Sequence, residues 1–308
     1  MFKLPNLPSA RAESNELADF AELVAWKRNS TSAREIIAYL GRLDDNDHNI
    51  GCDDNDDENA DGLDEVMNEI ERRQKACGEG YPFELDLDGT VLRYKTDQES
   101  HRSDVYRYLL LSTRLNMKTQ RVHDEIDGTT LLEEISASVL KNYLGANRAN
   151  SLVFGTAASG SFEDKINHLC QKLGEGGRYE NIDEGLAQAK DDKLDAVAWI
   201  PFADKKPGQL VIFGQCKTGS NWEGLMTQLQ PDAFLARWTR QKRYLLNPMK
   251  AFCISEAINR ARWSSSLLYA GLMFDRCRIV DFCDNLDEEL LTRIRLWNSA
   301  ASDSVVIG

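Results

Sequence analysis

The sequence comprises 308 residues, of which 42% are hydrophobic, and this is enough for one large α/β domain with a smaller domain beside it. No apolar run reaches the roughly 18 residues that a membrane-spanning helix needs. Lys3, Pro5 and Pro8 interrupt the first residues, so we expect no signal peptide. The seven cysteines form no CxxC pair, which favours reduced thiols over a zinc site or a disulfide framework. We therefore expect a cytoplasmic protein that does not contact a membrane.

The net charge of −13 is concentrated in the N-terminal part of the sequence. Residues 1–80 contain 19 acidic and 9 basic residues, which argues against a nucleic-acid contact there. Residues 237–262 instead carry a basic excess against a single acid, Glu256. These side chains could bind phosphates, because charge dominates affinity for a nucleic-acid backbone, and a solvated basic surface is the alternative. The candidate nucleic-acid-binding residues are Arg237, Arg240, Lys242, Arg243, Arg260 and Arg262.

The first third of the chain has mainly helical periodicity. Ser32 and Glu35 have the spacing of a capping box, which marks the start of a helix. Asp88 and Gly89 lie between two alternating apolar segments and predict the turn of a β-hairpin. Helices are predicted over residues 14–27, 32–41 and 63–77.

An acidic tract, residues 43–62, lies between the second and third of these helices and is predicted to form a loop because it is too polar to pack. Its motif Asp57-x-Asn59-x-Asp61 copies the first half of an EF-hand loop. Asn68 stands where the loop needs a bidentate Glu, so we do not expect calcium. Three helices and a hairpin are similar in outline to a winged-helix module, but the acidic charge opposes DNA. We interpret residues 1–95 as a small, mainly helical accessory domain that meets a protein partner.

Residues 103–308 alternate between helical and extended patterns, which predicts an α/β domain with a mixed central sheet flanked by helices. The polar turn ADKKPG makes residues 194–216 a hairpin. The predicted helices cover residues 103–122, 130–144, 161–173, 221–238 with an interruption near Pro231, 258–270 and 286–299. The predicted strands cover residues 151–157, 194–202, 209–216, 251–257 and 271–282.

Polar residues stand at the ends of the two apolar strands of this hairpin. Asp195 opens the first strand, and Gln215 and Lys217 close the second on either side of Cys216. Alternate residues of a strand face the same side, so Gln215 and Lys217 project together, and strand pairing can bring Asp195 beside them. A carboxylate can hold a divalent cation that polarises a phosphate, and a lysine can hold the attacking water. The pattern favours phosphodiester hydrolysis, with Cys216 turned into the core.

This arrangement resembles the PD-(D/E)xK nuclease superfamily, in the variant with Gln in place of the second acid that occurs among methyl-directed restriction enzymes. The resemblance covers residues 129–257 and implies a restriction-endonuclease-like core. It implies that Glu133, Asp195, Gln215 and Lys217 are the catalytic residues. It also implies that Glu133, Asp195, Gln215 and the backbone carbonyl of Cys216 hold Mg²⁺ or Mn²⁺. Because the second acid is missing, we expect weak metal binding until DNA phosphates complete the coordination shell.

The choice of Glu133 rests on helical phase. At 100° per residue Glu133 lies at the edge of the apolar stripe of residues 130–144, whereas Glu134 points away. We therefore expect Glu133 to reach the site and Glu134 to face water. The alternative is that both merely favour the dipole of the first helical turn.

The sequence thus predicts a Mg²⁺-dependent endodeoxyribonuclease, which the resemblance associates with bacterial antiviral defence against foreign DNA. The alternative is a non-catalytic subunit that retains the fold and binds nucleic acid or protein. The expected partners are DNA and a protein that docks on the acidic N-terminal domain, and a homo-oligomer is left open.

Overall fold

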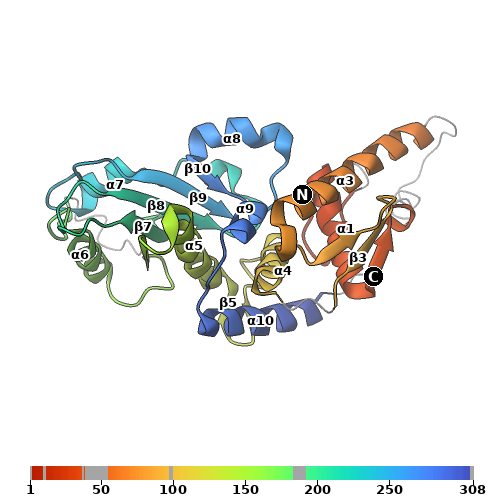
Figure 1. The fold of residues 1–308 in the computed structure, drawn as a ribbon, viewed down its shortest axis with the longest axis horizontal. Coiled ribbons are helices and arrows are strands. Elements are labelled where there is room, and N and C mark those ends of the chain that lie inside the picture. Colours follow the sequence, from red (N-terminus) through yellow and green to blue (C-terminus); the bar gives the residue numbers. More distant parts are fainter. Residues whose placement is uncertain are drawn as a thin grey trace.

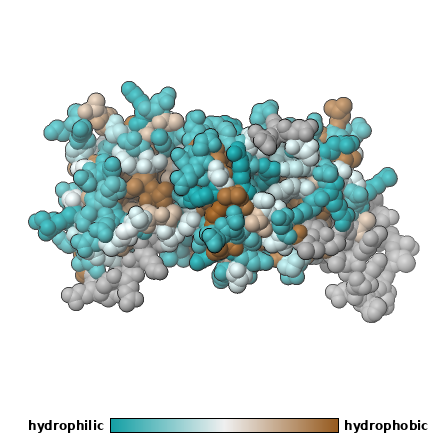
Figure 2. All heavy atoms as spheres, turned by 90° about the horizontal axis from the view of Figure 1, so that it is seen from below, coloured by the Kyte–Doolittle hydropathy of each residue, from teal (hydrophilic) through white to brown (hydrophobic). Residues whose placement is uncertain are grey.

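The computed structural model describes residues 2–9, 12–36, 38, 55–96, 100–182 and 192–305. Figure 1 shows an elongated molecule with the largest sheet in its left half and the N-terminal helices in its right half. Helices α4 (His101–Arg114) and α10 (Glu288–Asp303) pack against each other between and beneath these parts. Seen from below, the surface is mostly hydrophilic and its hydrophobic groups form separate small patches (Figure 2).

The large sheet has five strands in the order β10-β9-β8-β7-β6. β6, β7 and β8 form an antiparallel meander, and β9 and β10 run parallel to β8. The chain is therefore a mixed α/β protein, as predicted. The strand bounds are β6 Asn150–Val153, β7 Ala196–Ile200, β8 Leu210–Lys217, β9 Met249–Ile254 and β10 Leu272–Phe274.

Different helices cover the two faces of this sheet. α5 (Gly128–Gly145) packs on one face, and α6 (Phe162–Leu173) and α7 (Pro231–Trp238) pack on the other. Alternate residues of β7 show the division, because Ala198 belongs to the cluster of α5 and Val197 to that of α6 and α7. Burial on both faces explains why β8 reads as an almost continuous apolar run. α8 (Trp263–Ala270), which follows η4 (Arg260–Arg262), packs over β9 and β10.

The N-terminal part pairs α1 (Ser14–Arg28) and α3 (Asn55–Cys77) with a three-stranded antiparallel sheet in the order β1-β3-β2. The predicted capping box is confirmed, since Ser32 N donates to Glu35 Oε2 (2.9 Å) and Glu35 N to Ser32 Oγ (3.2 Å). The predicted hairpin is also confirmed, and Gly89 has the positive φ of 67° that its turn requires. The remaining bounds are β1 Ser30–Ser32, η1 Gly78–Gly80, β2 Phe83–Leu85, β3 Val91–Tyr94, β4 Val122–His123, β5 Ile126–Asp127, η3 Glu223–Leu225 and α9 Arg276–Asp281.

A buried network of charges joins the N-terminal helices to the rest of the chain. Asp19 on α1 is fully buried and lies 2.6 Å from Arg73, 2.6 Å from Arg114 and 2.7 Å from Arg276. These arginines belong to α3, α4 and α9. Glu22, one turn further along α1, accepts hydrogen bonds from two buried tyrosine hydroxyls at 2.8 Å. Four helices therefore meet around one buried cluster of opposite charges.

The same network reaches the loop that follows β8. Glu256 lies 3.5 Å from Arg114, and its Oε2 accepts a hydrogen bond of 2.6 Å from Trp222 Nε1. Burial raises the pKa of Glu256. Gly219 N donates to Ser255 Oγ at 3.1 Å. The loop after Lys217 is thus fixed to buried polar groups rather than free at the surface.

Parts of the predicted secondary structure are wrong. The helix predicted over residues 103–122 ends at Arg114, because Leu115 is extended (ψ 155°) and Asn116 forms a turn with Lys118. Residues 55–62 form the first turns of α3 instead of a loop, so the EF-hand-like motif lies in a helix; residues 43–54 lie outside the described residues. The strand predicted over 271–282 covers only β10, and Asp275 then caps α9.

Candidate active site

The candidate site lies at the end of the sheet where β6 ends, β7 begins and β8 ends. Asp195 directly precedes β7, whose Ala196 pairs with Gly214 of β8 and with Val153 of β6. The backbone of Asp195 is held on both sides: its N–H donates to Gly214 O (2.9 Å), and its carbonyl accepts from Phe154 N (2.8 Å) and Gly155 N (2.9 Å). The hairpin therefore fixes the position at which the Asp195 side chain leaves the sheet.

The Asp195 carboxylate is turned toward the end of β8. Its Oδ2 accepts a hydrogen bond of 2.6 Å from the backbone N–H of Cys216, and the residue is 5% exposed. This contact places the carboxylate beside the peptide that joins Gln215 to Cys216, so strand pairing brings Asp195 to the Gln-x-Lys segment, as the sequence predicted. The Cys216 side chain is buried in the cluster on the α5 side, and burial raises the pKa of its thiol, so it is suited to packing rather than to nucleophilic chemistry.

Gln215 and Lys217 differ in their surroundings. The Gln215 side chain is fully buried: its Oε1 accepts from Leu229 N and its Nε2 donates to Gln228 Oε1, both at 3.3 Å. Its amide therefore contacts the segment before α7. Lys217, two residues later on the same side of the strand, is half-buried. Its ammonium has neither a hydrogen bond nor an ion pair with another of the described residues.

Glu133 reaches the site from α5. It is 6% exposed, and its carboxylate accepts hydrogen bonds from Thr156 Oγ1 (2.8 Å) and Ala157 N (2.7 Å) in the loop that follows β6. Because β6 ends beside Asp195, α5 brings Glu133 to the same end of the sheet. Glu134 was expected to face water; it is partly exposed, but it also forms an ion pair of 2.5 Å with Arg293 on α10.

Exchanging each glutamate for glutamine should separate the two roles. If Glu133 holds or orients a metal, Glu133→Gln should lower metal-dependent activity of the chain about 100-fold. Glu134→Gln should leave cleavage nearly unchanged and cost no more than about 1 kcal/mol in unfolding free energy, because its ion pair is partly exposed. Cleavage rates of the two variants under identical conditions check this. The reverse order would mean that Glu133 only supports the loop after β6.

Gly155 makes room for Glu133, and the sequence patterns did not single it out. A Cβ at Gly155 would lie 2.5–2.8 Å from three atoms of the Glu133 carboxyl group. The signal in the sequence is weak, a glycine directly after an apolar strand in FGTA, which marks close approach only once the partner is known.

Replacing this glycine should therefore impair the site without removing any candidate catalytic group. We expect Gly155→Ala to lower cleavage at least about tenfold, since displacement of a catalytic group by 1 Å can cost 100-fold. Gly224→Ala is the matched control, because a Cβ there has nothing within 4 Å. Equal rates for Gly155→Ala and Gly224→Ala would show that the position of Glu133 is unimportant.

The site offers the oxygen donors that Mg²⁺ prefers, although only in part. Asp195 and Glu133 supply carboxylates at one sheet end, and the carbonyl of Cys216 belongs to the peptide that follows the one Asp195 contacts. Among the described residues, no group of three or more His, Cys, Asp or Glu side chains is arranged to hold a metal. The Gln215 oxygen is engaged by Leu229 N. These donors fit a cation that keeps several waters or phosphate oxygens in its shell.

The basic residues at the end of α7 and in the segment after it are partly paired with acids. Arg237 lies 2.9 Å from Asp192, and Lys242 lies 2.9 Å from Glu180. Arg240 and Arg243 have exposed side chains. Arg240 and Arg243 are therefore the two members of this group best placed to meet phosphates.

Arg260 and Arg262 lie elsewhere, on η4 beside α8, at the top of Figure 1. Arg260 stacks on Trp263 with its guanidinium 4.4 Å from the ring centroid. Arg262 forms ion pairs with Glu13 and Glu223. The six candidates thus come from two separate segments, and four of them have an acidic neighbour within 4 Å.

Comparison with family models, with curated proteins and with solved structures gives no significant match. Within the described ranges, no helix is long and apolar enough to cross a membrane. The interpretation of the site consequently rests on its own geometry.

Proposed function

We propose that the chain is a metal-dependent endodeoxyribonuclease that hydrolyses phosphodiester bonds of DNA. The observation that carries the proposal is the hydrogen bond from Cys216 N to Asp195 Oδ2, which joins the Asp and the Q-x-K segment at one sheet end. Glu133, held beside the end of β6, adds a second carboxylate there. A helix, an antiparallel meander and a parallel strand in this order support a restriction-endonuclease-like core.

Each residue has a distinct role in this proposal. Asp195 and Glu133 hold the cation, Mg²⁺ or Mn²⁺, which when bound polarises the phosphate and lowers the pKa of a water. Lys217 orients the attacking water and screens the negative charge that develops on the phosphate. Hydrogen bonds from backbone and Thr156 hold both carboxylates in place before any substrate arrives, so little reorganisation is needed.

A cleavage assay tests the proposal. The purified full chain is incubated with supercoiled plasmid DNA or with single-stranded RNA, in Mg²⁺, in Mn²⁺ or in EDTA. We expect nicked and linear DNA with either metal and intact plasmid in EDTA. Cleavage of RNA but not of DNA would show that the substrate is RNA. DNA that is bound but never cut, under any of these conditions, would contradict catalysis.

One observation favours the alternative of a non-catalytic binding subunit. Gln215, which stands where a second acid is more usual in the resembled superfamily, is fully buried and hydrogen-bonded to the segment 228–229. A side chain with these hydrogen bonds can stabilise the fold as well as it could bind a metal. The resemblance to a defence nuclease does not distinguish a metal-binding role of Gln215 from a structural one.

The variant Gln215→Glu distinguishes these two roles. Without metal, its buried charge faces the Gln228 oxygen, and we expect a loss of about 1–3 kcal/mol in unfolding free energy. If the side chain can turn to the metal, Mn²⁺ should bind at least tenfold more tightly than to the parent and restore stability. Gln209→Glu, another buried glutamine just before β8, is the control and should not respond to Mn²⁺. Calorimetric titration with Mn²⁺ that shows unchanged or weaker affinity for Gln215→Glu would favour the structural role.

A further inference from the structure

Trp263, the first residue of α8, contacts two arginine side chains from different elements. Arg260 belongs to η4 and Arg278 to α9, and the guanidinium carbon of each lies 4.4 Å from the centroid of the indole ring. The two guanidinium groups are therefore no more than twice that distance apart. Stacking on a ring holds a guanidinium by its flat face and leaves the N–H donors at its edge available. We call Arg260 and Arg278 the arginine pair.

Most N–H donors of the arginine pair have no acceptor among the described residues. The Arg260 guanidinium donates no hydrogen bond to any of them, and this side chain is 40% exposed. Arg278 is also exposed, and its Nη1 donates one hydrogen bond of 2.9 Å to the carbonyl of Met273. Donors that are held in place and still exposed suit an anion with several oxygen atoms, such as a phosphate.

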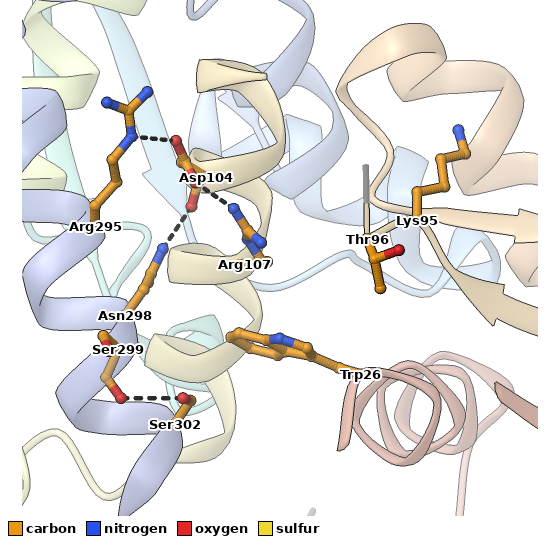
Figure 3. A pocket seen from close by; sticks show the side chains of 9 residues that line it. All are labelled: Trp26, Lys95, Thr96, Asp104, Arg107, Arg295, Asn298, Ser299 and Ser302. Carbon is orange, nitrogen blue, oxygen red and sulfur yellow. Dashed lines mark hydrogen bonds and ion pairs between the residues drawn. The ribbon is translucent and has the colours of Figure 1, made fainter. Parts of the chain in front are cut away.

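Other arginines of the chain are neutralised by carboxylates. Figure 3 shows Asp104 between Arg107 and Arg295, and both arginines form an ion pair with it, at 2.7 Å in the case of Arg295. Arg262, only two residues after Arg260, forms ion pairs with two acids. The positive charges of these arginines are thus compensated within the chain.

The arginine pair differs because its two cations share one acid. Asp275 is fully buried, and its Oδ2 lies 3.9 Å from Arg260 Nη2, beyond hydrogen-bonding distance. Its Oδ1 accepts a hydrogen bond of 3.1 Å from the backbone N–H of Arg278 and so caps α9. Within the described ranges, no other carboxylate forms an ion pair with either guanidinium. Two like charges held this close together, with one acid between them, favour the binding of an anion.

The arginine pair lies at the end of the sheet that holds the candidate active site. β8, β9 and β10 are parallel, so the end of β8 at Lys217, η4 after β9 and α9 after β10 follow the same edge. Lys217 pairs with Ile254 of β9, which packs in the cluster of α8, so both side chains point to the face that α8 covers. Two strand spacings, about 10 Å in total, separate β8 from β10. A strand of nucleic acid at Lys217 therefore reaches the arginine pair within a few nucleotides.

We propose that Arg260 and Arg278 bind neighbouring phosphates of the DNA strand whose scissile phosphate lies at Lys217. A guanidinium can donate two parallel N–H groups to one phosphate. Trp263 is a positioning residue, because it holds both guanidinium groups before DNA arrives and contacts no phosphate itself. Arg262 does not take part, since its charge is compensated. The inference rests on the proposed function, because it takes DNA as the ligand, and it adds residues that hold the strand outside the metal site.

The salt dependence of DNA binding tests the proposal. Anisotropy of a labelled duplex gives the affinity of the full chain in EDTA, which prevents metal-dependent cleavage, between about 50 and 200 mM KCl. Each neutralised phosphate contributes about 0.9 to the slope of log affinity against log salt. We expect Arg260→Gln and Arg278→Gln each to weaken binding about tenfold at the lower salt concentration and to reduce the slope by about 0.9. Arg262→Gln, with the same change in net charge, should leave the slope unchanged.

Variants of Trp263 test its positioning role. Trp263→Leu keeps both positive charges, so the slope should not change, but affinity should fall about fivefold or more because two arginine side chains must then be ordered on binding. Trp263→Phe keeps an aromatic ring and should restore most of the affinity. A thermal melt shows whether each variant is folded, and the arginine variants test the phosphate contacts independently of Trp263.

The proposal is overturned if Arg260→Gln and Arg278→Gln keep the slope of the parent, or if Arg262→Gln reduces the slope equally. Cleavage of plasmid DNA in Mg²⁺ by the same proteins separates this result from a failure of the proposed function. If the parent cuts DNA and the arginine variants bind it normally, only the phosphate contacts are refuted. If the parent binds DNA through the arginine pair but never cuts it, only catalysis is refuted. A parent that neither binds nor cuts DNA refutes both.

Discussion

The variant Asp195→Asn is expected to lose DNA cleavage almost completely, by about 1,000-fold or more, because a bound metal supplies several kcal/mol of transition-state stabilisation and each 1.36 kcal/mol is tenfold. The amide oxygen of Asn can still accept the hydrogen bond from Cys216 N, so the fold should persist. Initial cleavage rates in saturating Mg²⁺, together with a thermal melt of each protein, measure this.

Lys217 provides the matched comparison for Asp195. Lys217→Met keeps the apolar stem of the side chain and removes the ammonium, so we expect a loss of about 100-fold or more with Mn²⁺ affinity unchanged. Asp195→Asn should instead lose both cleavage and Mn²⁺ binding. An Asp195→Asn protein that cuts at the parent rate would refute the assigned metal ligand, and one that unfolds would indicate a structural role.

A large loss of stability is expected for Asp19→Asn. This residue lies among Arg73, Arg114 and Arg276 without solvent exposure. Removal of one partner from a buried ion pair typically costs about 3–5 kcal/mol, because the opposite charges stay buried and uncompensated. Urea unfolding at neutral pH measures the loss, with Asp88→Asn in the exposed turn of β2 and β3 as the control.

Asp19 should also make the unfolding free energy depend on pH, with lower stability in acid. Burial opposes the charge of Asp19, but Arg276, Arg114 and Arg73 outweigh it and hold the pKa of the carboxyl well below its ordinary value. Its contribution is therefore complete above the unfolded pKa, about 3.9, and is lost as the pH falls below that value. Between pH 5 and pH 3, roughly, the parent should lose more stability than Asp19→Asn. If the unfolding free energies of the two proteins changed equally with pH, the arginines would not stabilise the charge of Asp19.

The parts of the candidate site that could be predicted are those that periodicity determines. Strand alternation placed Gln215 and Lys217 on one side, and helical phase separated Glu133 from Glu134. The partners of Gln215 could not be predicted in this way. They belong to residues 228–229, and the strand pattern indicates which way a side chain points but not which loop packs against it.

In the N-terminal part, too, the sequence pattern predicted an element but not the partners of its side chains. Its apolar stripe predicted α1 correctly, yet Glu16, Asp19 and Glu22 on the remaining surface of that helix are buried rather than solvated. A charged residue is read as exposed unless its partner is known, and Arg276 is 257 positions away from Asp19. The apolar run at 271–282 was predicted as one strand. It contains a strand and a helix, because Asp275 follows β10 and caps the N-terminus of α9.

Crystals soaked in Mn²⁺ test the central claim most directly, because anomalous scattering locates the ion without reference to activity. We expect a peak at the sheet end, within coordination distance of an oxygen of Asp195 and an oxygen of Glu133. The peak should vanish in Asp195→Asn. Mn²⁺ bound only elsewhere, with both carboxylates still in their hydrogen bonds to Cys216 N and Ala157 N, would contradict a metal-dependent nuclease site here.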